Sequence, residues 1–186
     1  RSASVPWLPS RGSSPNPPPP IRTVAAQRFD AVFSQDLVGR LRKTATAQGS
    51  TLVTLLLAGF KLYLARITGS NTVVVGVPAA GQAARGMPQL VGHCVNLMPL
   101  RSQIDREARF PDFLRTVRNT MLDGNDHQHY AFGSLVRDLR VDRDPSRIPI
   151  TPIMFNIDNG IDLSDMRFGD AATEFVSNPR RFENFE

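Results

Sequence analysis

The sequence is poor in cysteine and in long apolar runs, and each shortage excludes a class of protein. Cys94 is the only cysteine in the chain, so an intrachain disulfide is impossible. The apolar stretches are interrupted by Gly, Ser, Thr and Gln, and none is long enough to cross a bilayer. The first residues lack the apolar stretch that follows a basic one in a signal peptide. We therefore predict a cytoplasmic protein with no membrane partner.

The basic charge of the chain does not have the pattern of a nucleic-acid site. The chain has 22 Lys and Arg against 17 Asp and Glu, a formal charge of +5, and only Lys43 and Lys61 are lysines. The arginines are dispersed, with no run of three and no interleaved aromatic residues, so we expect no nucleic-acid partner. One interpretation is an arginine-rich solvated surface without a dedicated partner. The functional alternative is a surface that attracts acidic proteins and phosphate groups.

The two ends of the chain differ in composition from its middle. Residues 1–26 are rich in proline and serine, and residues 17–20 are four consecutive prolines, which favour extended polyproline II. We predict a linker over 1–26 and a folded domain over 27–186. The sequence stops soon after the turn signal at residues 177–179, so we expect the domain to be truncated at its C-terminus.

Helix and strand patterns mix along the folded part, which predicts an α/β or α+β fold. Ser34 is a candidate N-cap, Ser50 or Thr51 a second one, and Gly49 and Gly69 are candidate helix ends. The second helix is apolar on nearly all sides, so we expect it to be buried at the centre. The predicted helices cover residues 35–48, 52–67, 110–122 and 132–139, and the predicted strands 27–34, 72–78, 97–104, 153–157 and 174–176.

Three segments carry the most specific signal. They are Val-Gly-His-Cys-Val-Asn-Leu-Met-Pro-Leu-Arg at 91–101, His-Gln-His-Tyr-Ala-Phe at 127–132 and Arg-Asp-Pro-Ser-Arg-Ile-Pro-Ile at 143–150. In this order and at these separations they resemble the late signature motifs of the condensation domains of nonribosomal peptide synthetases. The buried helix followed by Val-Val-Val-Gly-Val-Pro-Ala-Ala-Gly at 73–81 is similar to the same family. Residues 177–184 resemble condensation domains of mixed polyketide–peptide assembly lines.

The resemblance implies a fold and a reaction. The fold is that of chloramphenicol acetyltransferase, in which two α/β lobes, each a β-sheet flanked by helices, enclose a tunnel. The reaction joins two acyl or aminoacyl groups through an amide bond, while donor and acceptor carrier proteins hold them as thioesters on 4′-phosphopantetheine. The resemblance implies no cofactor bound directly by this chain.

The family's catalytic motif, His-His-x-x-x-Asp-Gly, does not occur in this sequence. We therefore expect the chain to be the C-terminal lobe, which supplies one wall of the tunnel and works with the N-terminal lobe of the same domain. We assign it no catalytic residue and expect the isolated chain to be inactive. A lobe without its partner exposes an apolar face, so we also expect self-association.

Gly92, His93 and Asn96 are the candidate tunnel residues. An asparagine amide donates and accepts hydrogen bonds, so Asn96 could orient a thioester carbonyl or an amine. The alternative is an asparagine that ends a strand by bonding its own backbone. Gly92 permits positive φ or close backbone approach. The family often has aromatic residues where this chain has His93 and Cys94. The resemblance therefore does not predict which side chains line the tunnel at these positions.

The other motif residues are predicted to be structural. The histidines at 127 and 129 lie near Asp123 and Asp126, but a zinc site needs three or four converging ligands, so we predict no metal. The second motif should hold a loop against a helix end, and the charged residues of the third should lock a turn. The residues assigned these roles are His127, Gln128, Phe132, Arg143, Asp144, Ser146 and Arg147.

Two other interpretations of the sequence stay open. The first is a non-catalytic module of the same fold that binds carrier proteins or another lobe. The second is an unrelated acyltransferase whose general base is His93 or His127. Replacement of each histidine by alanine separates them, because only an acyltransferase of the second kind would lose its activity.

Overall fold

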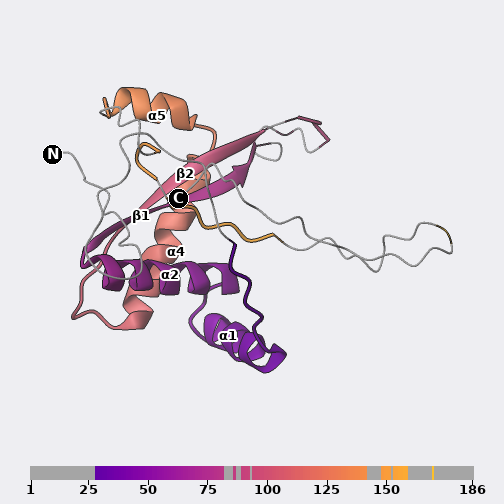
Figure 1. Cartoon of the computed structure of the whole chain (residues 1–186), viewed down its shortest axis with the longest axis vertical. Helices are drawn as coiled ribbons and strands as arrows, with labels where there is room; N and C mark the ends of the chain where they lie inside the picture. Colours follow the sequence, from indigo (N-terminus) through magenta and orange to yellow (C-terminus); the bar gives the residue numbers. More distant parts are fainter. Residues whose placement is uncertain are drawn as a thin grey trace.

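The computed structural model describes residues 28–81, 86, 89–92, 94–141, 148–151, 153–158 and 169. Within them the chain forms four main helices and one β-hairpin (Figure 1). In chain order the elements are α1 (Gln35–Ala47), α2 (Leu52–Thr68), β1 (Thr72–Ala80), β2 (Val95–Gln103), α4 (Phe110–Asp126) and α5 (Phe132–Asp138). This mixture of helices and strands confirms the predicted fold class.

Strands β1 and β2 pair antiparallel over their whole length, from Thr72 opposite Gln103 to Ala80 opposite Val95. The other edge of β1 is bonded too, because Gly76 N donates to Ile153 O and Phe155 N donates to Gly76 O, both at 2.9 Å. These two bonds form a parallel bridge at Gly76. The prediction of an inner strand at 72–78 is therefore confirmed.

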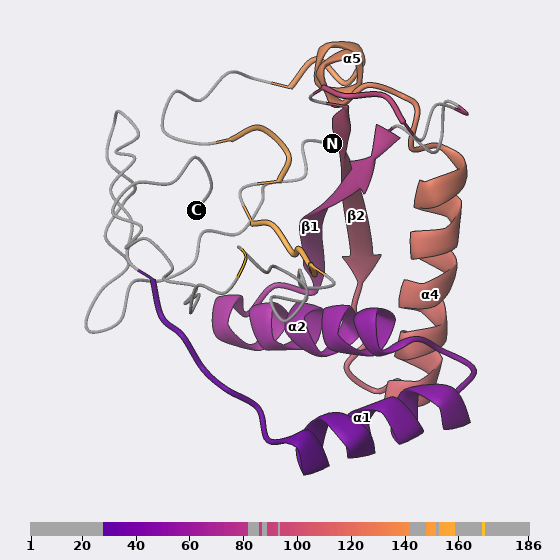
Figure 2. The same ribbon diagram turned by 90° about the vertical axis from the view of Figure 1, so that its right-hand side faces the viewer.

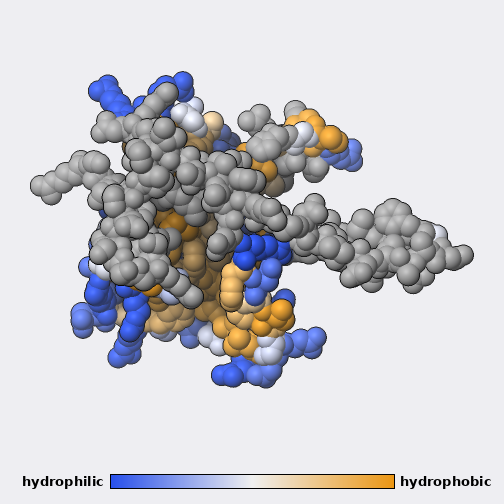
Figure 3. All heavy atoms as spheres, in the orientation of Figure 1, coloured by the Kyte–Doolittle hydropathy of each residue, from blue (hydrophilic) through white to orange (hydrophobic). Residues whose placement is uncertain are grey.

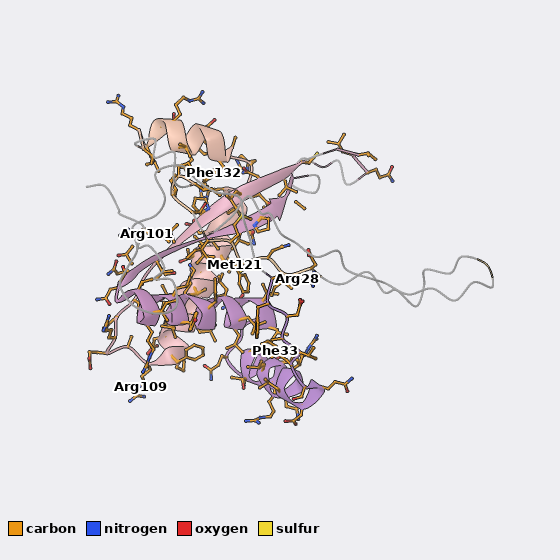
Figure 4. All side chains as sticks on the ribbon, viewed as in Figure 1. Arg28, Phe33, Arg101, Arg109, Met121 and Phe132 are labelled. Carbon is orange, nitrogen blue, oxygen red and sulfur yellow. The ribbon has the colours of Figure 1, made fainter. Side chains whose placement is uncertain are left out.

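Helices α2 and α4 cover the hairpin and enclose the core. Figure 2 shows α4 running beside the hairpin and α2 crossing below it, with α1 beneath α2. Thr54 Oγ1 donates to Met121 Sδ at 3.6 Å, and Figure 4 shows Met121 where α4 passes α2. The core is formed by apolar residues of α2, β1, β2 and α4, among them Leu55, Leu57, Leu64, Val73, Val75, Leu100, Leu114 and Val117.

Local sequence signals define the helix ends, as predicted. Ser34 Oγ accepts a hydrogen bond from Leu37 N at 3.2 Å, which caps α1. Thr51, and not Ser50, caps α2, since Thr51 Oγ1 accepts from Thr54 N at 3.2 Å. Gly49 follows the C-cap of α1 with φ 61°, and Gly69 ends α2 with φ 69°, both in the left-handed region that favours glycine.

Two predicted strands differ from the structure. Residues 28–34, the described part of the strand predicted at 27–34, form no strand, because the described residues offer them no pairing partner. Phe29 and Val32 are 92% and 97% exposed, so no burial replaces the missing pairing. The strand predicted at 153–157 is reduced to the bridge at Met154. The strand predicted at 174–176 and the linker predicted at 1–26 lie outside the described residues.

A search of the described residues for membrane spans found no single helix of sufficient length and apolar character. Helices α1 and α2 meet the length and composition criteria only when taken together, and the pair is bent by 98°.

Candidate functional site

Asn96 connects the hairpin to the turn between α4 and α5. It is the second residue of β2 and lies opposite Ala79 of β1. Its side-chain Nδ2 donates to Gln128 O at 2.7 Å and to Tyr130 O at 2.8 Å. Its Oδ1 accepts from Phe132 N at 3.1 Å. One half-buried amide therefore bonds three peptide groups of the segment 128–132.

These bonds restrict what Asn96 can do for a substrate. Both hydrogens of the amide nitrogen are used, so donation to a substrate carbonyl would require one of these bonds to break. The predicted alternative, in which Asn96 bonds its own backbone, is wrong, because Asn96 bonds the backbone of a distant segment. That Asn96 lines a substrate tunnel stays a prediction.

The turn that Asn96 contacts begins where α4 ends. His127 is the C-cap of α4, and Tyr130 N donates to His127 O at 3.0 Å. The His127 ring Nδ1 lies 2.9 Å from Asp123 O and 3.8 Å from the Asp123 carboxylate. The His127 side chain is 75% exposed, and its contacts are those of a histidine at a helix C-terminus. Among the described residues, no three His, Cys, Asp or Glu side chains gather as a candidate metal site.

Tyr130 and Asp138 join the turn to the far end of α5. The Tyr130 hydroxyl donates to the Asp138 carboxylate. This hydrogen bond, with smaller contributions from burial and from the Asp138 charge, raises the pKa of Tyr130. Neither residue has a predicted role, although the spacing of eight residues across a predicted turn and helix allows the contact.

Glycines shape the connection between β1 and β2. Gly92 has φ 156°, which favours glycine, but a Cβ there would meet no atom within 4 Å. The positive-φ role considered for Gly92 is therefore observed, and close approach is not. Close approach occurs at Gly81, where a Cβ would lie 2.3 Å from Cys94 O. Gly81 N also donates to Cys94 O at 2.9 Å, which brings the two backbones together.

Lys61 is a buried polar residue that the sequence analysis did not single out. It lies on α2 with no exposed surface, and Nζ donates to Leu100 O and to Ser102 Oγ, both at 2.8 Å. Burial lowers the pKa of Lys61 to about 8. The sequence signal that could have indicated its burial is a lone lysine within an otherwise apolar helical stretch. The contact ties α2 to the strand that carries Asn96.

Several predicted site residues cannot be placed. His93 lies outside the described residues, as do the four charged or polar residues of the third motif. Gln128 is half-buried and takes part through its carbonyl, and Phe132 takes part through its backbone N–H at the start of α5, where Figure 4 labels it. The structure thus brings Asn96, Gln128 and Phe132 together. The residues outside the described part are His93, Arg143, Asp144, Ser146 and Arg147.

Comparison with known sequences gives one family. Residues 3–183 match the family model described as "Condensation domain". Gramicidin S synthase 2 of Brevibacillus brevis is 35% identical over 143 residues, which cover 77% of this chain and 3% of that protein. Tyrocidine synthase 2 of Brevibacillus parabrevis is 33% identical over 143 residues, which cover 77% of this chain and 4% of that protein. The chain therefore spans a small fraction of the curated relatives it matches.

Comparison with solved structures gives the same fold. A holo four-domain nonribosomal peptide synthetase, bound to AMP and glycine, matches with a TM-score of 0.78 at 23% identity, over 86% of this chain and 12% of that one. The condensation domain of the Monacolin K polyketide synthase matches with a TM-score of 0.69 at 20% identity, over 81% of this chain and 35% of that one. The predicted fold, a lobe of the chloramphenicol-acetyltransferase type, is confirmed by this likeness.

Proposed function

Because the chain belongs to the condensation-domain family of nonribosomal peptide synthetases, we propose that it is the C-terminal lobe of an amide-forming domain. The observation that carries the proposal is the family match over residues 3–183, in a sequence that contains no His-His-x-x-x-Asp-Gly motif. The lobe supplies one wall of the substrate tunnel, and the N-terminal lobe of the same domain supplies the histidine that assists the attacking amine. Residues 1–26 are then the linker between the lobes, and 27–186 belong to the second lobe.

The proposed reaction is acyl transfer from a thioester to an amine. The amine nitrogen forms a bond to the thioester carbonyl carbon, the carbon–sulfur bond breaks, and the thiol leaves with a proton. Both substrates are held on carrier proteins through 4′-phosphopantetheine. One tunnel that receives both reduces the entropic cost of bringing the reacting atoms together.

The charge of the chain supports carrier-protein partners. Its formal charge of +5 favours approach by partners that bear carboxylates and phosphate groups. The single cysteine suits a reducing cytoplasm, where we place the reaction. The resemblance of residues 177–184 to domains of mixed assembly lines supports a hybrid polyketide–peptide pathway.

Within the tunnel wall, we assign Gly92, His93 and Asn96 to the part of β2 and its preceding loop that faces the substrates. Gly92 supports this role through its positive φ, which lets the chain turn before β2 begins. Asn96 contributes to the wall indirectly, because its bonds hold the 128–132 segment against β2. The third motif stabilises the wall by holding a turn in place. The residues with this role are Arg143, Asp144, Ser146 and Arg147.

The test compares the isolated chain with the same chain joined to its upstream lobe. Each protein is mixed with a loaded donor and a loaded acceptor carrier protein, and the amide product is measured by mass spectrometry. We expect product from the two-lobed protein and none from the isolated chain, because the assisting histidine lies on the other lobe. Amide formed by the isolated chain would contradict the proposal.

Two further outcomes separate the alternatives. A two-lobed protein that binds carrier proteins but forms no product would favour the non-catalytic module. The family match argues against an unrelated acyltransferase, and the variant His127→Ala checks this. We expect His127→Ala to keep most of the activity of the two-lobed protein, since the His127 side chain is 75% exposed and contacts its own helix end. If the single substitution His127→Ala abolished the activity of the two-lobed protein, a general base on this lobe would be favoured.

A further inference from the structure

We propose that Asn96 is a positioning residue, which fixes the segment 128–132 and the start of α5 against β2, and that it donates no hydrogen bond to the substrates. Its effect on catalysis rests on the function proposed above. Its effect on the structure does not, because that follows from contacts within this chain alone.

The hydrogen-bond donors of the Asn96 amide are both occupied. A neutral asparagine amide has two N–H donors and a carbonyl oxygen with two lone pairs. Both donors go to Gln128 O and Tyr130 O, and the oxygen receives Phe132 N. A substrate carbonyl would therefore compete with two existing bonds, at 2.7 and 2.8 Å, that satisfy backbone groups of the turn.

Helix α5 lacks an N-terminal side-chain cap of its own. It has seven residues, Phe132–Asp138, which is too short for a stable helix without outside contacts. Its N-cap is Ala131, which has no side-chain oxygen to accept a bond from the first N–H groups. Asn96 Oδ1 accepts from Phe132 N instead, so a residue of β2 performs the capping role. Figure 2 shows α5 above the end of the hairpin where β2 begins.

In the described part of the chain, no other side chain makes the connection that Asn96 makes. Among the residues that the structure describes, every hydrogen bond between β2 and the segment 127–132 comes from the Asn96 side chain. The bond between Tyr130 and Asp138 joins the turn to α5 and leaves β2 out. Loss of the Asn96 amide would therefore free the turn and α5 from the hairpin together.

Two substitutions separate the donor and acceptor roles. Asn96→Ala removes all three bonds. Asn96→Asp keeps an oxygen for Phe132 N but turns a second carboxylate oxygen toward the carbonyls of Gln128 and Tyr130, which repel it. Protonation of the new carboxyl group restores one donor, so the defect of this variant should decrease at low pH. The matched control is Asn119→Asp, the same chemical change at an exposed position of α4.

The experiment measures amide hydrogen exchange by mass spectrometry in the intact two-lobed domain, with rates corrected for intrinsic exchange. Asn96→Ala should speed exchange of peptides that cover 128–135 by about tenfold or more, because three hydrogen bonds that hold this segment are lost and a tenfold change corresponds to only about 1.4 kcal/mol. Peptides from α2 should keep wild-type exchange, which shows that the domain is folded. Asn96→Asp should exchange faster at about pH 8 and recover in part at about pH 4, near the ordinary pKa of an aspartate side chain, and Asn119→Asp should match the wild type.

The activity of the same variants completes the test. A positioning role predicts that Asn96→Asp loses the same fraction of kcat with every amine and acyl pair, and regains part of it at low pH in parallel with the exchange. Unchanged exchange at 128–135 in Asn96→Ala would overturn the proposal, and so would faster exchange with full activity. If the alanine variant does not fold, the pH dependence of exchange in Asn96→Asp decides whether the positioning role is correct. If the wild-type two-lobed domain forms no amide, the proposed function is refuted. The structural role of Asn96 is then tested by the exchange measurement alone.

Discussion

Lys61 shows how burial changes the chemistry of a single residue. Its side chain has no exposed surface, and among the described residues its amine contacts a carbonyl and a hydroxyl and no carboxylate. An ammonium group in such surroundings loses hydration that no opposite charge replaces. The pKa of Lys61 is therefore lowered from 10.5 to about 8.

The lowered pKa of Lys61 predicts a stability that depends on pH. Between pH 8 and pH 10.5 the unfolded chain binds the proton and the folded chain does not, so the free energy of unfolding rises with pH in this window. Below pH 8 both states are protonated, and the contribution of Lys61 is constant. The total rise should be about 3 kcal/mol. Urea denaturation across the window measures it.

Substitution isolates the contribution of Lys61 from those of other groups that titrate at alkaline pH. Lys61→Met should remove the rise, because no proton is then released on folding. Lys43→Met, at the exposed position of the other lysine, should retain it. Equal pH dependence in the wild type and in Lys61→Met would contradict the prediction.

At the scale of the elements, glycine has opposite roles in helices α2 and α4. Gly59 lies on the exposed side of α2, where a Cβ would meet no atom within 4 Å. Gly124 lies where α4 crosses β2, and a Cβ there would be 2.8 Å from Leu100 Cδ2. Leu100 is 3% exposed and belongs to the core, so it has little room to move. Gly124 therefore sets how closely α4 approaches the hairpin.

This contrast predicts opposite effects of the same substitution. Gly59→Ala should stabilise the protein by about 0.5–1 kcal/mol, because alanine has the higher helix propensity. Gly124→Ala should destabilise it by about 1 kcal/mol, since displacement of a buried leucine outweighs the same gain in propensity. Chemical denaturation of both variants checks the signs, and a stabilised Gly124→Ala would show that α4 can withdraw from β2.

At the scale of the whole molecule, the apolar surface is unevenly distributed. The extended residues before α1 expose large side chains, with Phe29 at 92%, Val32 at 97% and Phe33 at 59%. Figure 3 shows apolar atoms gathered around α1 at the lower right, and Figure 4 labels Phe33 in the same region. Exposed apolar groups of this size, close together in the sequence, are typical of a contact surface.

We therefore expect the isolated chain to self-associate. At micromolar concentration it should sediment as a dimer or larger species, because association removes these side chains from water. The double substitution Phe29→Ser and Val32→Ser should shift the distribution toward monomer. Tyr63→Ser, at a site on α2 that is 58% exposed, serves as the control and should leave it unchanged. A wild-type chain that sediments as a monomer would contradict the prediction.

The sequence predicted the four helices and the two strands of the hairpin, and it pointed to Asn96, Gln128 and Phe132 as residues of interest. Caps such as Ser34 and Thr51, the ends at Gly49 and Gly69, and the apolar periodicity of α2 and α4 act within a few residues, so they can be recognised without coordinates. The three late motifs also led to the condensation-domain family, which the comparisons show. The strand predicted at 27–34 failed because alternation indicates a potential for pairing and does not supply the partner strand.

Only the tertiary structure determines the contacts between residues far apart in the chain. The sequence pointed to Asn96, but only folding brings it to Gln128 and Phe132, 32 and 36 residues away, where it bonds backbone groups. Lys61 acquires its low pKa because α2 buries it against Leu100 and Ser102, which belong to another element. Local patterns follow from the conformational preferences of neighbouring residues, whereas hydrogen-bond partners and desolvation depend on which segments the core brings together.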